Sequence, residues 1–247
     1  MKKIFIFIFI FIFIFIFHLN ANAMSINSML IVSDNNGNGV FTIKNNEETP
    51  IFIDVKLAKV FIDNGRLIKK NYTKDNLSTW EVSVDTNKFI LEAGMQKNIG
   101  VQSLCSSSCN LEQDNIYTVQ FTPTPYSKDD SLDSGININY GYEGVFIIPA
   151  VSKNISYSMV RHGNLINIKN DSNTTLEMTF DECQDGNGDR CLTKTILLPK
   201  KVRSIKLQKN QIHNVVNVIV NSVDEKFFRK EAIYNEKNIF FKNKDSK

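Results

Sequence analysis

Histidine and the residue patterns of common active sites are scarce in this sequence. Of 247 residues only three are histidines, at positions 18, 162 and 213. None of them accompanies a nucleophile motif such as G-x-S-x-G. Paired carboxylates, metal-ligand spacings and phosphate-binding glycine loops are also missing. We therefore expect a protein that is not an enzyme and that needs no metal and no cofactor.

Two acidic, asparagine-rich segments come closest to a metal site. The run Asp34–Gly39 matches the opening of a calcium-binding loop, but its twelfth position is Asn45, where a bidentate glutamate is required. A similar run at residues 185–189 has Ile196 at its twelfth position. We interpret both runs as turns between strands.

Long apolar stretches are absent except at the start of the chain. Lys2 and Lys3 precede an unbroken phenylalanine and isoleucine run, Ile4–Phe17, and Ala21-Asn22-Ala23 follows as a small-x-small cleavage signature. The apolar run is too short to span a bilayer as a helix. We expect residues 1–23 to be a cleaved secretion signal, so that the mature chain is exported and does not insert into a membrane.

An excess of charge of one sign is also absent. The chain has 29 basic and 26 acidic residues, and loss of the signal leaves 27 against 26. This balance does not favour a nucleic-acid-binding protein. Seven of the basic and three of the acidic residues lie from Lys226 onward. We interpret the last residues, 236–247, as a solvated basic tail, although the apolar residues Ile239-Phe240-Phe241 could dock on another surface.

Cysteine is sparse, and all four residues lie in the exported part, at Cys105, Cys109, Cys183 and Cys191. Four cysteines permit three pairings. An oxidising compartment and the two short spacings favour the bridges Cys105–Cys109 and Cys183–Cys191, each closing a local loop. Neither spacing fits a zinc site, and no redox C-x-x-C motif is present.

What the mature chain does have is a succession of short alternating segments. Apolar and polar residues alternate with period two, and asparagine, aspartate and glycine separate the segments, a pattern typical of β-strands. About seven strands precede Pro149 and a second series follows it. A weak helical pattern at residues 226–233 fits a last strand equally well. We predict an all-β protein of two tandem immunoglobulin-like β-sandwich domains, residues 24–149 and 150–235.

The most informative segment is Ser134–Pro149, in which the alternation is clearest. The apolar members that share one face are Ile136, Ile138, Tyr140 and Tyr142. Such a strand is first of all a candidate core strand of its own sandwich. The alternative is a strand that lends its apolar face to another protein, and the segment alone does not decide between them.

The order of several segments resembles a known family, the periplasmic chaperones of chaperone–usher pilus assembly. The segments that carry the resemblance are MSINSMLIVSD from Met24, WEVSVDTNKFILEAG from Trp80, Ile116–Pro123, VFIIPA from Val145 and YSMVRHGNLINIKNDSNTTLEMTF from Tyr157. A cysteine pair placed like Cys183 and Cys191 is similar to one in the alternate and archaic branches. The resemblance covers nearly the whole mature chain.

The resemblance implies a periplasmic chaperone whose partners are pilus or fimbrial subunits and an outer-membrane usher. A subunit lacks the last strand of its sandwich, and the chaperone supplies that strand, a mode called donor-strand complementation. The side chains expected to enter the subunit are Ile136, Ile138, Tyr140 and Tyr142.

The sequence departs from this family at the basic residues that hold the subunit's terminal carboxylate. Residues 25–32 and 136–146, where the family carries them, contain no lysine or arginine. Lys153 and Arg161 are possible substitutes. The apolar alternation is also one residue out of phase relative to Pro149, which a bulge near Gly141 or Gly144 could absorb.

Two other functions fit an exported all-β chain. A pilus subunit or adhesin would usually carry an apolar N-terminal extension and lack its last strand. An exported two-domain binding protein would need an exposed aromatic cluster away from the segment at residues 134–149.

Overall fold

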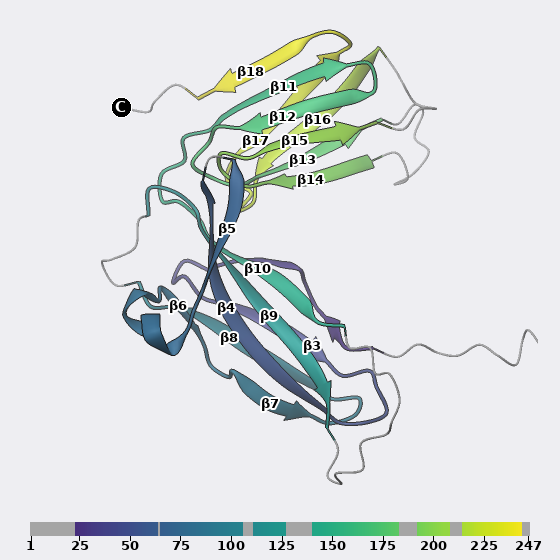
Figure 1. Cartoon of the computed structure of the whole chain (residues 1–247). Helices are drawn as coiled ribbons and strands as arrows, with labels where there is room; N and C mark the ends of the chain where they lie inside the picture. Colours follow the sequence, from purple (N-terminus) through teal and green to yellow (C-terminus); the bar gives the residue numbers. More distant parts are fainter. Residues whose placement is uncertain are drawn as a thin grey trace, which may run out of the picture.

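The structure, a computed structural model, describes residues 23–63, 65–105, 111–126, 140–182, 192–207 and 214–243. These residues form two β-sandwiches in tandem (Figure 1). The predicted fold class, an all-β chain with two immunoglobulin-like sandwiches, is confirmed. Several predictions concern residues outside this part of the chain, namely residues 1–22 of the predicted signal, the predicted turn at 185–189, Ile136, Ile138, Cys109, Cys183 and Cys191.

The first sandwich contains the elements up to residue 148. They are β1 (Ser25–Ile26), β2 (Leu30–Val32), β3 (Gly39–Lys44), β4 (Ile51–Asp63), β5 (Arg66–Asn71), the 3-10 helix η1 (Lys74–Thr79), β6 (Val82–Val84), β7 (Lys88–Leu91), β8 (Gln96–Ser103), β9 (Asn115–Pro125) and β10 (Tyr142–Ile148). One sheet has the order β1-β3-β8-β6, and the other has β2-β10-β9-β4-β5 with β7 also paired to β4. Their facing side chains form one core.

The second sandwich is built in the same way from the remaining elements. They are β11 (Ser156–His162), β12 (Leu165–Asn170), β13 (Leu176–Asp181), β14 (Leu192–Leu197), β15 (Val202–Lys206), β16 (Val215–Ser222), β17 (Phe228–Tyr234) and β18 (Asn238–Lys242). The sheets have the orders β15-β12-β11-β18 and β14-β13-β16-β17 and enclose a separate core.

The first strand of the chain divides between the two sheets, which the sequence did not predict. A single strand over residues 26–32 is expected from its apolar residues, whereas β1 pairs with β3 and β2 pairs in parallel with β10. Between them the Ser28 hydroxyl donates to the Leu30 carbonyl oxygen (2.6 Å) and accepts from the Leu30 N–H (3.2 Å). This local bonding competes with the ladder and lets the chain change sheets.

The end of the chain belongs to the second sandwich further than the sequence indicates. Residues 236–247 are expected to form a solvated tail, but β18 pairs with β11 over Asn238–Lys242. The Phe241 ring stacks on Tyr157 with 5.3 Å between centroids, and the Arg229 guanidinium lies 4.3 Å from its centroid. The boundary at residue 235 is therefore too early, because aromatic packing anchors this strand. The weak helical pattern at 226–233 is also resolved, since β17 lies there.

Gly144 in β10 gives a testable measure of how closely the first core is packed. A Cβ at this position would lie 2.5 Å from the Cε1 atom of Phe41, a buried ring that has little room to move. Gly144→Ala is expected to lower the free energy of unfolding by about 1–3 kcal/mol in urea denaturation. Gly100→Ala is the control, since its nearest neighbour is the end of the exposed Asp85 side chain. Equal stability of the two variants would contradict the tight packing.

Candidate functional site

Strand β10 continues the apolar alternation that the sequence places at residues 136–142. Tyr142 packs against the first core, and Phe146 and Ile148 are buried within it. The residues between them, Val145 and Ile147, lie on the other face of the sheet. The pairing of β10 with β9 is continuous from Tyr142 to Ile148, so no bulge occurs over those residues. The even-numbered side chains of β10 therefore belong to this protein's own core, and the preceding even-numbered residues of the segment continue the same face beyond it.

One edge of β10 is open at its beginning. β9 pairs with β10 along its whole length, but β2 pairs only with Val145–Ile147. The Val145 N–H donates to the Met29 carbonyl oxygen (2.8 Å), and the Ile147 carbonyl oxygen accepts from the Ser33 N–H (2.8 Å). Since backbone groups alternate in direction along a strand, those of Glu143 point to the same side. Among the described residues no strand covers that side of Glu143.

Tyr140 and Gly141 lead into this open edge. The Tyr140 side chain is 71% exposed, so it is available to a second molecule. At Gly141 a Cβ would lie 2.7 Å from the Phe121 carbonyl oxygen, and therefore only glycine lets the backbone pass so closely. Of the four predicted donor residues, the structure describes two. Tyr142 is the first residue of β10, and Tyr140 lies two residues before it.

Glu143 is also held from the outer face of the sheet. Its Oε2 atom lies 2.6 Å from the Nζ atom of Lys69. Lys69 belongs to β5, which is the strand at the other edge of the same sheet. Burial opposes the charged form of Glu143, but hydrogen bonds from Lys69 and Thr118 outweigh it and the pKa of the carboxyl is lowered. The carboxylate thus stays charged and fixes the strand at the residue whose edge is open.

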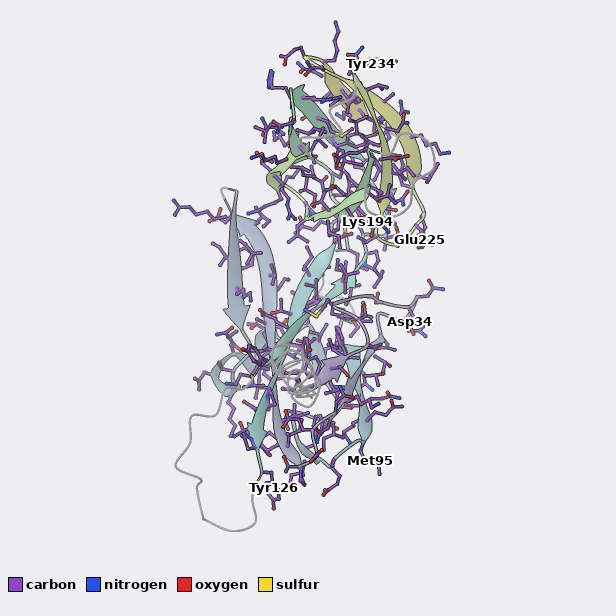
Figure 2. All side chains as sticks on the ribbon, turned by 90° about the vertical axis from the view of Figure 1, so that its right-hand side faces the viewer. Asp34, Met95, Tyr126, Lys194, Glu225 and Tyr234 are labelled. Carbon is purple, nitrogen blue, oxygen red and sulfur yellow. The ribbon has the colours of Figure 1, made fainter. Side chains whose placement is uncertain are left out.

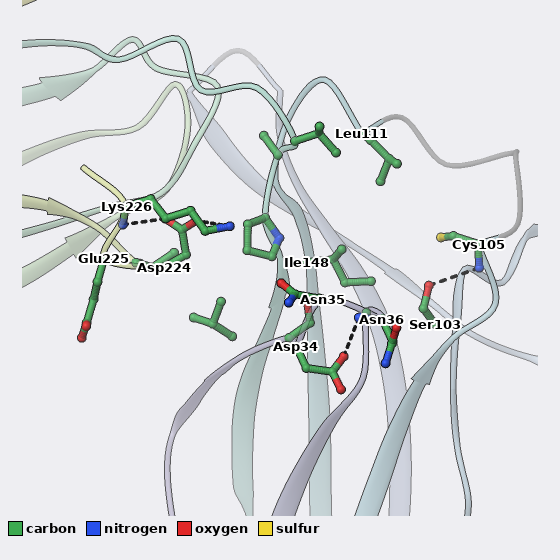
Figure 3. A pocket seen from close by; sticks show the side chains of 17 residues that line it. Asp34, Asn35, Asn36, Ser103, Cys105, Leu111, Ile148, Asp224, Glu225 and Lys226 are labelled. Atoms are coloured by element: carbon green, nitrogen blue, oxygen red, sulfur yellow. Dashed lines mark hydrogen bonds and ion pairs between the residues drawn. The ribbon is translucent and has the colours of Figure 1, made fainter.

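A cleft of about 640 Å³ lies between the two sandwiches (Figure 3). The loop after β2, the end of β8, the linker after β10 and the turn between β16 and β17 surround it. Asp34 lines it, and its Oδ1 accepts from the N–H groups of Asn36 (2.9 Å) and Asn38 (2.8 Å), which confirms the predicted turn. Among the described residues no three potential metal ligands gather anywhere.

Lys153 pairs with Asp224 beside this cleft. The Nζ atom of Lys153 lies 2.6 Å from Oδ2 of Asp224, and both side chains are largely buried. Burial would raise the pKa of Asp224, but bonds from Lys153 and Ser222 outweigh it, so the pKa is lowered. Lys226 also lines the cleft, and its Nζ atom lies 3.9 Å from Oδ2 of Asp224.

The Lys153–Asp224 pair has a testable pH dependence. At pH 7 the Asp224→Asn variant is expected to be less stable than the unmodified protein by about 1–3 kcal/mol. The pKa of Asp224 is lower in the folded protein, so its contribution is present above its unfolded pKa and is lost as the pH falls through the folded value. Urea denaturation should show the difference shrinking below about pH 4. A difference independent of pH would contradict a charged pair, and Glu225→Gln is the exposed control.

Arg161 lies elsewhere, inside the second sandwich. It is completely buried, and its guanidinium donates to the carbonyl oxygens of Gly163 (3.0 Å) and Ile233 (3.2 Å). Burial lowers its pKa. A carboxylate that arrives from solvent cannot reach this group while these bonds hold. The structure therefore separates the two basic residues that the sequence offered as substitutes.

A buried carboxylate, which no sequence pattern indicates, joins the two sandwiches. Asp114 precedes β9 and accepts from the Ala150 N–H (2.9 Å), the Thr175 N–H (2.6 Å) and the Thr174 hydroxyl (3.1 Å). Asn173 adds bonds from its side-chain amide to the carbonyl oxygens of Glu112 and Ser152 (2.8 Å). An acidic residue directly before a strand gave no signal of this role. Asp114 fixes the linker and the second sandwich, and so positions the cleft.

The remaining predicted residue is Cys105. It is disulfide-bonded, and it lines the cleft (Figure 3). Its predicted partner Cys109 lies outside the described residues, as do Cys183 and Cys191. The pairing scheme therefore stays a prediction. In the described part of the chain no helix is both long and apolar enough to cross a membrane.

This fold is shared by solved fimbrial chaperone structures. The class 5 fimbriae chaperone CfaA is 20% identical with a TM-score of 0.50, over 89% of this chain and 98% of that one. A chain of the Salmonella enterica SafA pilin–SafB chaperone complex is 12% identical with a TM-score of 0.54, over 87% and 97%. A chain of the CsuC–CsuE complex from archaic Csu pili of Acinetobacter baumannii is 10% identical with a TM-score of 0.53, over 87% and 100%. The predicted resemblance to pilus-assembly chaperones is confirmed at the level of the fold.

Sequence comparison identifies the family. Residues 26–149 match the family described as CS5 fimbrial protein N-terminal domain, and the chain belongs to that family. An Escherichia coli relative, described as an uncharacterized 25.9 kDa protein in the CS5 3'region, is 25% identical over 190 residues, which are 75% of this chain and 82% of the relative. The family consists of fimbrial proteins and not of enzymes, as the sequence predicted.

Proposed function

We propose that this protein is a periplasmic chaperone that captures fimbrial subunits by donor-strand complementation and delivers them to an outer-membrane usher. The observation that carries the proposal is the open edge of β10 at Glu143, next to an apolar face that continues from the protein's own core. A strand in this position can add to a second, incomplete sandwich without leaving the first. The family assignment and the fold support the same function.

The apolar side chains and the backbone have different parts in this binding. Ile136, Ile138 and Tyr140 would fill the groove that the subunit's missing strand leaves, at roughly 1.5–3 kcal/mol each before ordering costs. Tyr142, the fourth predicted member, packs against this protein's own core and is left out of the groove. Each backbone hydrogen bond along the open edge adds about 0.5–1.5 kcal/mol and does not depend on sequence. The side chains therefore set the register, while the backbone allows several related subunits to be bound.

The proposed anchor for a subunit's terminal carboxylate is Lys153. Its ammonium lies beside the cleft at the end of β10, and a client carboxylate would replace Asp224 as its partner. Lys226 lies on the same cleft and would support the exchange. Because Arg161 is occupied inside the second sandwich, we leave it out of the proposed anchor.

The proposed function is tested by mixing the purified mature protein with a CS5-type fimbrial subunit diluted from denaturant. We expect a one-to-one complex in size-exclusion chromatography with light scattering, and slowed hydrogen exchange of the Glu143 amide in the complex. Glu143→Pro removes that outward N–H and should weaken the complex, whereas Glu143→Ala removes only the side chain and its bond to Lys69. A subunit that stays aggregated, or a complex that leaves the Glu143 amide unprotected, would refute the proposal.

A further inference from the structure

Charge is distributed very unevenly between the two sandwiches, although the whole chain is nearly neutral. Residues 24–149 contain 10 basic and 15 acidic residues, whereas residues 150–247 contain 17 basic and 11 acidic residues. The sharpest segregation is at residues 190–223, which include seven basic residues and no acidic residue. This segment contains β14, β15 and β16.

The basic segment includes β15, a strand with an open edge at the side of the second sandwich. β15 is the terminal strand of its sheet and pairs only with β12 (Figure 1). The Lys201 carbonyl oxygen accepts from the Asn170 N–H (3.0 Å), and the Leu207 N–H donates to the Asn164 carbonyl oxygen (2.7 Å). Because bonding alternates along an antiparallel pair, the backbone groups of residues 202, 204 and 206 point away from β12. No strand of the described chain covers them.

In the part of the chain that the structure describes, the cations along this edge are not paired with acidic side chains. Among the described residues Arg203 and Lys206 form no ion pair, and neither do Lys200 and Lys201 just before the strand. The Lys201 ammonium donates to the Gly65 carbonyl oxygen at the tip of the β4–β5 hairpin (3.2 Å). That bond holds the tip of the β4–β5 hairpin against the second sandwich, and Figure 2 shows the hairpin projecting beside it.

We propose that the open edge of β15 is a docking site for an extended, acidic segment of another polypeptide, which adds to the four-stranded sheet as a further strand. Backbone bonds to residues 202, 204 and 206 would hold the segment along the edge. Acidic side chains on it would pair with Arg203, Lys206 and the lysines at 200 and 201. This proposal concerns the second sandwich and does not depend on the function proposed for β10.

An acidic polypeptide fits this edge better than an anionic membrane does. The outward backbone groups repeat at the spacing of a strand, which a second extended backbone satisfies and lipid headgroups do not. β15 also lacks an aromatic side chain, and its one strongly exposed apolar residue is Val202. Membrane-surface elements combine basic residues with a broad apolar face that enters the bilayer.

The experiment measures binding of fluorescein-labelled ten-residue peptides to the full mature protein by fluorescence anisotropy. The probes alternate pairs of glutamates with pairs of threonines, which puts acidic side chains on both faces of the added strand, or, as the uncharged match, pairs of glutamines with pairs of threonines. We expect only the acidic peptide to bind, more weakly at 300 than at 50 mM NaCl. Arg203→Gln with Lys206→Gln should weaken binding about fivefold. The control is Lys44→Gln with Lys88→Gln, which removes two exposed cations of the first sandwich and should change nothing.

Ser204→Pro separates strand addition from simple charge attraction. Proline there removes an outward N–H without breaking a backbone bond to β12. It also removes the Ser204 hydroxyl, which donates to Oδ1 of Asn167 (2.6 Å), so the control is Ser204→Ala, which loses only that bond. Binding of the acidic peptide should weaken in Ser204→Pro and stay normal in Ser204→Ala. Unchanged binding by Ser204→Pro would overturn the proposal, as would equal binding of both peptides. Binding to phosphatidylglycerol vesicles without binding to the peptide would assign the edge to a membrane instead. If neither binds and the Arg203, Lys206 variant aggregates, the cations only prevent self-pairing and the proposal fails.

Discussion

Replacing Ile138 and Tyr140 together with aspartate is expected to abolish capture of a fimbrial subunit while the free protein stays folded. Each apolar side chain is expected to contribute about 1.5–3 kcal/mol to the complex, so the pair accounts for about 3–6 kcal/mol. That loss corresponds to a dissociation constant about 10²–10⁴ times higher. The buried carboxylates would make the loss larger, because the groove offers them no partner. Complex formation is measured by size-exclusion chromatography at several concentrations.

The matched control is the double change Asn137→Asp with Asn139→Asp, which adds the same charge at alternate positions of the same segment. Because side chains alternate between faces, these residues would not enter the subunit, and capture should persist. Near-ultraviolet circular dichroism of the free proteins distinguishes the two interpretations of the segment. If the Ile138, Tyr140 variant unfolds by itself, the segment is a core strand of its own sandwich and the donor-strand proposal is wrong.

Asp114→Ala is expected to give the largest loss of stability among the changes considered, about 3–5 kcal/mol. The carboxylate is buried and accepts from two backbone N–H groups and one hydroxyl, all of which would lose their acceptor. We also expect the angle between the sandwiches to vary, because these bonds join β9 to the linker and to the second sandwich. Small-angle X-ray scattering should show a larger radius of gyration and a broader distance distribution.

Asp85→Ala is the control for Asp114. Asp85 also accepts a backbone N–H, from Gly100 at 3.0 Å, but it is exposed and lies within one sandwich. Its loss should cost less than about 1 kcal/mol and leave the scattering profile unchanged. Asp114→Asn retains one acceptor and should be intermediate. If the scattering profiles of Asp114→Ala, Asp114→Asn and the unmodified protein coincide, Asp114 does not fix the angle between the sandwiches. The apolar contact around Ile147, Leu198 and Val223 would then fix it alone.

The even-numbered face of β10 shows which structural features a sequence pattern can predict and which it cannot. Alternation along residues 136–142 predicts which side chains share a face, because strand geometry is local, and Tyr142, which lies in β10, packs against the first core as that pattern expects. The same pattern could not show that the edge at Glu143 is open, since this depends on β2 ending its pairing at Val145. Likewise a lysine in a linker and an aspartate in a turn carry no mark of pairing, and only folding brings Lys153 and Asp224 to 2.6 Å.

The sequence by itself determined the all-β class, the two successive sandwiches and the resemblance to pilus-assembly chaperones, while the export signal expected at residues 1–23 stays a prediction. All of these depend on period, turn residues and order along the chain, which are local properties. The tertiary structure decided the division of the first strand, the docking of β18, the burial of Arg161, the Asp114 junction and the open edges of β10 and β15. These depend on which distant segments meet, and side-chain packing and hydrogen bonding set those meetings only when the whole chain has folded.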